Sequence, residues 1–223
     1  MRLAFAIVAL CVLLAPPILA QEDGASPDRA LRLSDRAVEA PGGEGAGSLH
    51  ARAVGVARSA ARQNPGSGRA HSILAVVLGR YADWLAHERR LAAAATVVEL
   101  GREAHRHALR AIELDREQWI AWAFLGVMHR RLATVPRLVR VVARTFLDWP
   151  DVSLEQSERY LARAVRIEPN EVTTRLELAR TYLAMGREAD ARRQLEASLV
   201  LEPRDRLDRD HHAAARRLLE EID

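Results

Sequence analysis

Residues 175–203 read RLELARTYLAMGREADARRQLEASLVLEP, and this stretch decides the fold. Gly186 separates two periodic segments, and Pro203 closes the second, because proline lacks a backbone N–H and stops a helix. Small and large residues recur three or four positions apart in each segment, which is the spacing of one helix face. They are Leu178, Ala179 and Tyr182 in the first segment and Ala191, Leu195 and Ser198 in the second. The stretch predicts two helices packed against each other.

The same spacing recurs upstream. Pro169 stands 34 residues before Pro203, and Leu161 and Ala164 precede it as Leu195 and Ser198 precede Pro203. Earlier positions repeat the pattern of small residues: Ala53, Ala57 and Ala60 before Pro65, and Ala104, Ala108 and Ala111 before Arg116. Another first helix is predicted from Trp122-x-x-Leu125-Gly126-x-x-His129. Self-similarity at a fixed period is typical of a repeat architecture.

This spacing resembles the tetratricopeptide repeat, a helix pair of about 34 residues. The resemblance implies an all-α fold, a right-handed α-α superhelix in which small residues let paired helices approach closely. The repeat ends fall at 65, 116, 169 and 203, so two middle units are enlarged. Residues 82–98 hold no Gly or Pro, so we expect two longer helices there, the second over 88–114. Pro136 and Pro150 bracket an expected short extra helix over 137–149.

Both ends of the chain have their own predictions. Residues 28–39 are expected to form the first helix of an opening repeat, followed by a flexible glycine-rich loop over 41–47. Residues 208–223 are expected to form a capping helix, which an open stack needs to cover its last apolar face. The repeats, about four helix pairs, are therefore assigned to 21–207.

Residues 1–20 have the anatomy of a secretory signal peptide. Arg2 precedes an apolar run from Leu3 to Leu14, and Ala20 offers a small residue for cleavage before Gln21. The alternative is an uncleaved N-terminal helix that anchors the protein to a membrane. Cys11, the single cysteine, lies in this leader, so a protein cleaved after Ala20 has no disulfide and no thiolate chemistry. The leader predicts an exported protein, periplasmic in a bacterial cell envelope.

The charged residues argue against nucleic acid. The chain has 33 basic and 30 acidic residues, its basic residues are all Arg, and the two signs alternate along the sequence. A nucleic-acid-binding protein concentrates its positive charge in one patch. No nucleic-acid partner is predicted.

The subfamily signal lies in the C-terminal two thirds of the chain. The phrases LEQSERYL at 154–161, LELARTYL at 176–183 and AAARRLL at 213–219 resemble bacterial relatives of the regulator of microtubule dynamics family, over about 68–222. The resemblance implies a helical-repeat fold and a scaffold or adaptor role. Microtubule association is not carried over, because an export signal on a lysine-free chain indicates a bacterial envelope protein.

We find no constellation that would support catalysis, and the protein is predicted not to be an enzyme. Metalloprotease, phosphate-loop, nucleophile-elbow and dinucleotide motifs are missing from the sequence. His105 and His107 point about 200° apart on a helix, so they cannot share one metal ion. Neither a cofactor nor a metal is predicted.

A binding role has a place in this fold, because the first helices of successive repeats line a concave groove. The predicted groove residues are mostly arginines: Arg69, Arg80, Val127, Arg130, Arg131 and Arg180. A guanidinium can hold a carboxylate by two parallel hydrogen bonds. We therefore expect a protein or peptide partner that offers an acidic segment or a C-terminal carboxylate. Membrane contact through the leader or through residues 137–149 is the alternative.

Overall fold

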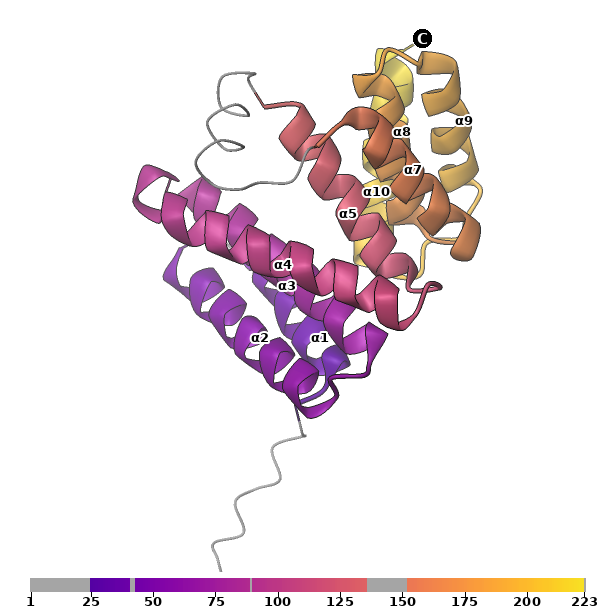
Figure 1. Ribbon diagram of the computed structural model, residues 1–223. Helices are drawn as coiled ribbons and strands as arrows, with labels where there is room; N and C mark the ends of the chain where they lie inside the picture. Colours follow the sequence, from indigo (N-terminus) through magenta and orange to yellow (C-terminus); the bar gives the residue numbers. More distant parts are fainter. Residues whose placement is uncertain (1–24, 41–42, 89, 136–151, 223) are drawn as a thin grey trace, which may run out of the picture.

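The computed structural model describes residues 25–40, 43–88, 90–135 and 152–222 (Figure 1). Within these ranges the regular elements are all helical, and one is a short 3-10 turn, η1. They are α1 (Pro27–Glu39), α2 (Glu44–Gln63), α3 (Gly68–Glu88), η1 (Arg90–Ala93), α4 (Ala94–Leu114), α5 (Trp119–Ala133), α7 (Leu154–Ile167), α8 (Val172–Ala184), α9 (Glu188–Leu199) and α10 (Arg206–Glu221). The expected short helix over 137–149 lies outside the described residues. None of the described helices combines the length and the apolar character needed to cross a membrane.

The helices pack as four successive pairs, α1 with α2, α3 with α4, α5 with α7, and α8 with α9, and α10 follows. Each first helix also contacts the first helix of the next unit, in the order α1, α3, α5, α8, α10. This is the predicted all-α, tetratricopeptide-type superhelix. The first helices lie in a row, and we call the face along this row the inner face; residues of α1, α3 and the start of α10 line a pocket there.

Small residues hold the paired helices together as predicted. Ala57, Ala104, Ala108, Ala164 and Ala191 are each at most 1% exposed. The second helices α2, α4 and α7 end two residues before positions 65, 116 and 169, and an amide just beyond each helix bonds back to a buried alanine carbonyl. Gly186 has φ +71° in the turn between α8 and α9, where glycine is unstrained.

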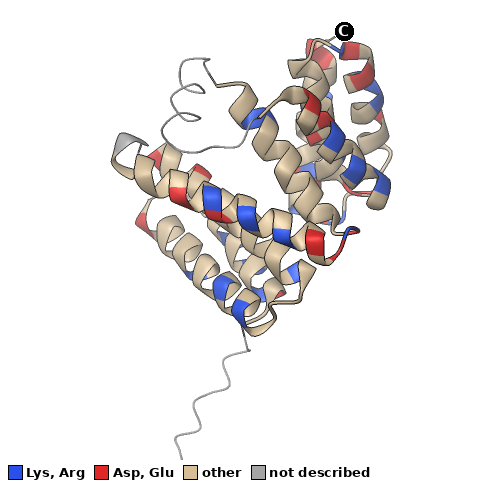
Figure 2. Ribbon diagram, in the orientation of Figure 1, with Lys and Arg blue, Asp and Glu red and all other residues tan. Residues whose placement is uncertain are grey.

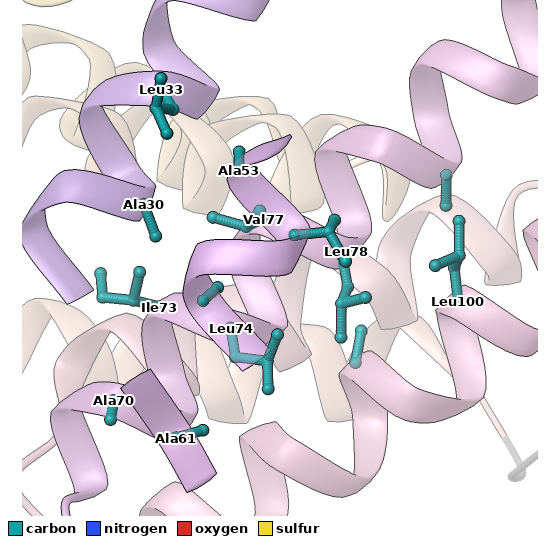
Figure 3. Packing of buried hydrophobic residues seen from close by; sticks show 14 of the residues in the cluster. Ala30, Leu33, Ala53, Ala61, Ala70, Ile73, Leu74, Val77, Leu78 and Leu100 are labelled. Carbon is teal, nitrogen blue, oxygen red and sulfur yellow. The ribbon is translucent and has the colours of Figure 1, made fainter. Parts of the chain in front are cut away.

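The largest core cluster surrounds α3. Figure 3 shows Ile73, Leu74 and Leu78 of α3 among side chains of its neighbours, and all three are at most 1% exposed. A second cluster joins α8, α9 and α10 around Leu176 and Leu195. Burying a leucine stabilises the fold by about 1.5–3 kcal/mol, so these clusters hold the two ends of the stack.

Two local predictions need correction. Residues 44–47, expected in a flexible loop, form the start of α2. Gly47 packs closely there, since a Cβ at this position would lie 2.5 Å from Cη2 of Trp84. The second helix of the enlarged unit begins at Ala94 rather than at residue 88. The chain must reverse between two antiparallel helices of 21 residues each, and the 3-10 turn η1 occupies part of that reversal.

Candidate binding face

The structure places each arginine that the sequence analysis singled out in an ion pair. At one end, Arg69 and Arg80 of α3 reach across to α1. Arg69 Nη2 lies 2.5 Å from Asp28 Oδ1, and Arg80 Nη1 lies 2.7 Å from Asp35 Oδ1. Both arginines are therefore paired with a carboxylate of α1 within the protein.

The next two contacts between first helices, α3 with α5 and α5 with α8, also contain an arginine–carboxylate ion pair. Arg131 of α5 pairs with Asp83 of α3, and both side chains are about half exposed, at 52% and 55%. Arg130, its neighbour on α5, points the other way and pairs with Glu177 of α8. Val127, one turn earlier on α5, is half-buried.

Glu177 is shared by two arginines. Arg180 Nη1 lies 2.5 Å from Glu177 Oε1, while Arg130 donates to Oε2. Burial alone would raise the pKa of Glu177, but the charges and hydrogen bonds of Arg130 and Arg180 outweigh it and lower that pKa. Glu177 is therefore a carboxylate at neutral pH, and it balances one of two positive charges.

The last step uses an arginine that sequence reasoning did not single out. Arg204, just before α10, donates to Glu171 Oε2 at 2.8 Å and to Asp208 Oδ2 at 2.9 Å. The sequence could have indicated the contact with Asp208, because Arg204 and Asp208 stand four residues apart, the spacing of an ion pair along a helix. His211 of α10 adds a hydrogen-bond contact between its Nδ1 and Thr173 Oγ1 of α8, at 2.9 Å. Each neighbouring pair of first helices is thus linked by at least one arginine–carboxylate bridge. In the last step, the two bridging residues stand just before α8 and α10.

The predicted groove residues are brought together only in part. Arg130 and Arg180 meet at Glu177, and Arg131 follows Arg130 in sequence, whereas Arg69 sits near the start of α3. Figure 2 shows acidic and basic residues interspersed along the helices. Most of the inner positive charge is consequently balanced within the protein. Three arginine side chains of the predicted set stay partly exposed: Arg69 and Arg131 at 52% each, and Arg180 at 36%.

A pocket of about 160 Å³ lies where the first helix meets the last. Its walls come from the end of α1, from α3, and from the start of α10. The lining residues are Asp35, Val38, Glu39, Arg80, Asp205, Arg206 and Leu207. Sequence reasoning named only Arg80 among them, because residues so far apart in sequence meet only when the row of first helices curls.

Four histidines are buried: His50, His71, His129 and His212. His129 is 4% exposed and lies edge-on to Tyr160 with ring centroids 5.2 Å apart. Burial, helped by the charges of His105 and Arg159, lowers the pKa of His129 to about 4. His107 Nδ1 lies 2.8 Å from His71 Nδ1 on α3. In the described ranges, no group of three or more His, Cys, Asp or Glu side chains could hold a metal ion.

Comparison with known proteins adds a family. The family description "Regulator of microtubule dynamics protein 1-3" matches residues 29–223. Among solved structures, a thermophilic TPR protein of Thermus thermophilus is 17% identical with a TM-score of 0.39, covering 85% of this chain and 98% of that one. PilF of Pseudomonas aeruginosa is 21% identical with a TM-score of 0.33, covering 88% and 91%. No curated protein sequence matches this chain significantly.

Proposed function

This chain belongs to the regulator of microtubule dynamics protein 1-3 family, and from that membership and its helical-repeat fold we propose that it is an exported protein-interaction module. It acts as a scaffold or adaptor, and it holds a segment of a partner protein against the first helices. Binding, not catalysis, is its activity. Microtubules are left out of the proposal, because residues 1–20 have the anatomy of a bacterial export signal and the chain has no lysine.

The observation that supports the proposal is an excess of positive charge at Glu177, where two guanidinium groups share one carboxylate. One buried carboxylate faces two arginines, and Arg180 keeps part of its surface open to the inner face. A carboxylate of a partner could accept hydrogen bonds from Arg180 and from Arg131 on the neighbouring helix. We assign the partner an acidic segment or a C-terminal carboxylate.

Peptide binding tests this assignment. The probes are a fluorescein-labelled Asp/Glu-rich peptide with a free C-terminus and the same peptide amidated, measured by fluorescence anisotropy with the full chain. The double variant Arg131→Gln, Arg180→Gln should bind the acidic probe about tenfold more weakly, because two charge-assisted contacts are lost. Arg130 stays in place, since its buried pairing with Glu177 supports the fold.

The matched control makes the same charge change away from the inner face. Arg110 on α4 and Arg193 on α9 are exposed arginines of second helices, at 50% and 67%. The variant Arg110→Gln, Arg193→Gln should bind like the wild type. Equal binding by wild type and by the Arg131, Arg180 variant would contradict the acidic groove.

Localisation is tested separately by sequencing the N-terminus of the protein purified from its own cells. Gln21 as the first residue supports an exported, cleaved form, periplasmic in a bacterial envelope. An intact leader supports the alternative, a membrane-associated envelope factor anchored by an uncleaved N-terminal helix. A pull-down from envelope extract with the same variants then identifies the partner.

A further inference from the structure

The pocket between α1 and α10 collects apolar surface that the fold leaves uncovered. Four large hydrophobic side chains are exposed in the described part of the chain: Val38, Leu109, Val200 and Leu207. Val38 is 55% exposed and Leu207 is 37% exposed, and both line this one pocket although they stand 169 residues apart. Single exposed hydrophobic residues are ordinary, but two that converge from opposite ends of the fold make a specific place for an apolar group.

The charged lining of the pocket is partly paired within the protein. Asp35 accepts from Arg80 Nη1 at 2.7 Å, so this pair is neutral. Arg206 Nε lies 3.8 Å from Asp210 Oδ2, and both side chains are about two-thirds exposed, at 69% and 67%. These two pairs account for both arginines of the lining.

Two carboxylates are left over. Glu39 ends α1 and is exposed, and no described residue forms an ion pair with it. Asp205 caps α10 by accepting from the Asp208 amide at 2.8 Å through Oδ1, and its second oxygen carries no such bond to the described residues. The C-terminal end of α1 adds partial negative charge at the same place, whereas the positive end of α10 is met by Asp205 itself. The unpaired charge at the pocket is negative.

The size of the site indicates its occupant. A volume of about 160 Å³ suits one side chain. Stable association of two chains normally buries about 1,200–2,000 Å², far more than two exposed aliphatic groups supply. A second copy of this chain is therefore a poor fit, and an extended peptide that inserts one residue is a good one.

We propose that the pocket between α1 and α10 receives an aliphatic side chain of the partner segment, with an adjacent Lys or Arg of that segment held by Glu39 and Asp205. The inference rests on the proposed function, because it assumes that the inner face binds a partner segment. It adds specificity to that function: the partner is anchored at this end by an apolar–basic pair, while its acidic part meets Arg131 and Arg180. The same anchor also bridges the first and last helices of the stack.

A photocrosslinking probe locates the site. The probe is a fluorescein-labelled Gly/Ser peptide with one photo-leucine flanked by lysines, offered to the full chain. Crosslinks should fall on the segments that contain Val38 and Leu207, as read by mass spectrometry. Crosslinks confined to other helices, or no binding of the probe by the wild type, would overturn the proposal.

Affinity variants test the two parts of the recognition. Val38→Ser combined with Leu207→Ser should weaken binding of the apolar–basic probe about tenfold, because the anchor loses its contact, and Glu39→Gln should weaken it about threefold. The control variant Leu109→Ser, Val200→Ser removes the other two exposed hydrophobics and should leave binding unchanged. The helical circular dichroism spectrum of each variant is compared with that of the wild type to check that the variant is folded.

Comparison probes keep the proposal falsifiable. Replacing the lysines of the probe by glutamates should weaken its binding to the pocket, and equal or tighter binding would refute the negative character of the site. Dimerisation of the wild type that the Val38, Leu207 variant loses would assign the pocket to a second copy and overturn the proposal. The acidic probe of the inner face is measured on the same variants. If the wild type binds the acidic probe but not the apolar–basic probe, the pocket assignment fails and the proposed function stands.

Discussion

Glu177 of α8 pairs with Arg130 of α5 on the inner face, and their side chains are only 10% and 16% exposed. The pair links the third and fourth helix pairs of the stack. Arg130 Nε is also buried without a hydrogen-bond partner. The ion pair with Glu177 is therefore the interaction that compensates the charge of this guanidinium. A buried charge that loses its partner is strongly destabilising, whereas an exposed pair contributes little.

Removing the charge of Glu177 should therefore destabilise the protein. We expect Glu177→Gln to lower the free energy of unfolding by about 3 kcal/mol, because two guanidiniums then face no carboxylate. The control is Asp83→Asn, which breaks the exposed pair with Arg131 and should cost under about 1 kcal/mol. Urea unfolding followed by circular dichroism measures both. Equal losses in the two variants would show that burial of the pair does not matter.

Acidification should weaken the fold through His129. Its pKa is about 4 in the folded protein and 6.5 for an ordinary histidine, so the unfolded chain binds more protons between these values. The stabilisation is complete above pH 6.5 and is lost as the pH falls toward 4, by at most about 3 kcal/mol. His129→Phe keeps the ring against Tyr160 and should flatten the stability profile between pH 6.5 and 4. A variant profile parallel to that of the wild type would contradict the assignment.

Close helix approach at Gly126 gives a third prediction. A Cβ at this position would lie 2.5 Å from Cγ of Leu161, which is fully buried. Gly126→Ala should destabilise the protein by about 1–3 kcal/mol, because α5 and α7 must move apart. Gly55→Ala on α2 meets nothing within 4 Å and should stabilise by up to about 1 kcal/mol through helix propensity. Thermal melts should show shifts of opposite sign, and shifts of the same sign would rule out the steric explanation.

Ser157 connects three helices. Its Oγ donates to the carbonyl of Gly126 at 2.8 Å and lies 3.0 Å from Thr181 Oγ1, and the side chain is fully buried. Ser157→Ala leaves the Gly126 carbonyl short of that donor and should cost about 1–3 kcal/mol of stability. Thr134→Ala, which removes an exposed hydrogen bond to the Arg131 carbonyl, serves as the comparison and should cost less than about 0.5 kcal/mol. Chemical denaturation measures both stability losses, and an unchanged m-value would attribute the larger loss in Ser157→Ala to the folded state.

The sequence alone predicted the helix pairs and their approximate ends. The reason is that helix formation and pair packing depend on short-range spacing: Ala104, Ala108 and Ala111 fall on one face, and each is fully buried in the structure. The same local pattern predicted the family and the all-α superhelix. It missed the turn η1 and the helical start of α2, because no Gly or Pro marks that turn and Gly47 does not show in sequence that it packs against Trp84.

The tertiary structure decided which charged residues of the inner face form ion pairs. The sequence identified Arg69, Arg80, Arg130, Arg131 and Arg180 as inner residues, but not that each meets a carboxylate. Four of these partners stand 41–48 positions away, so the ion pairs depend on how one repeat is rotated against the next. The pocket of Val38 and Leu207 depends on the sum of all those rotations. Local spacing fixes a helix, whereas only the accumulated curvature of the stack brings its first and last helices together.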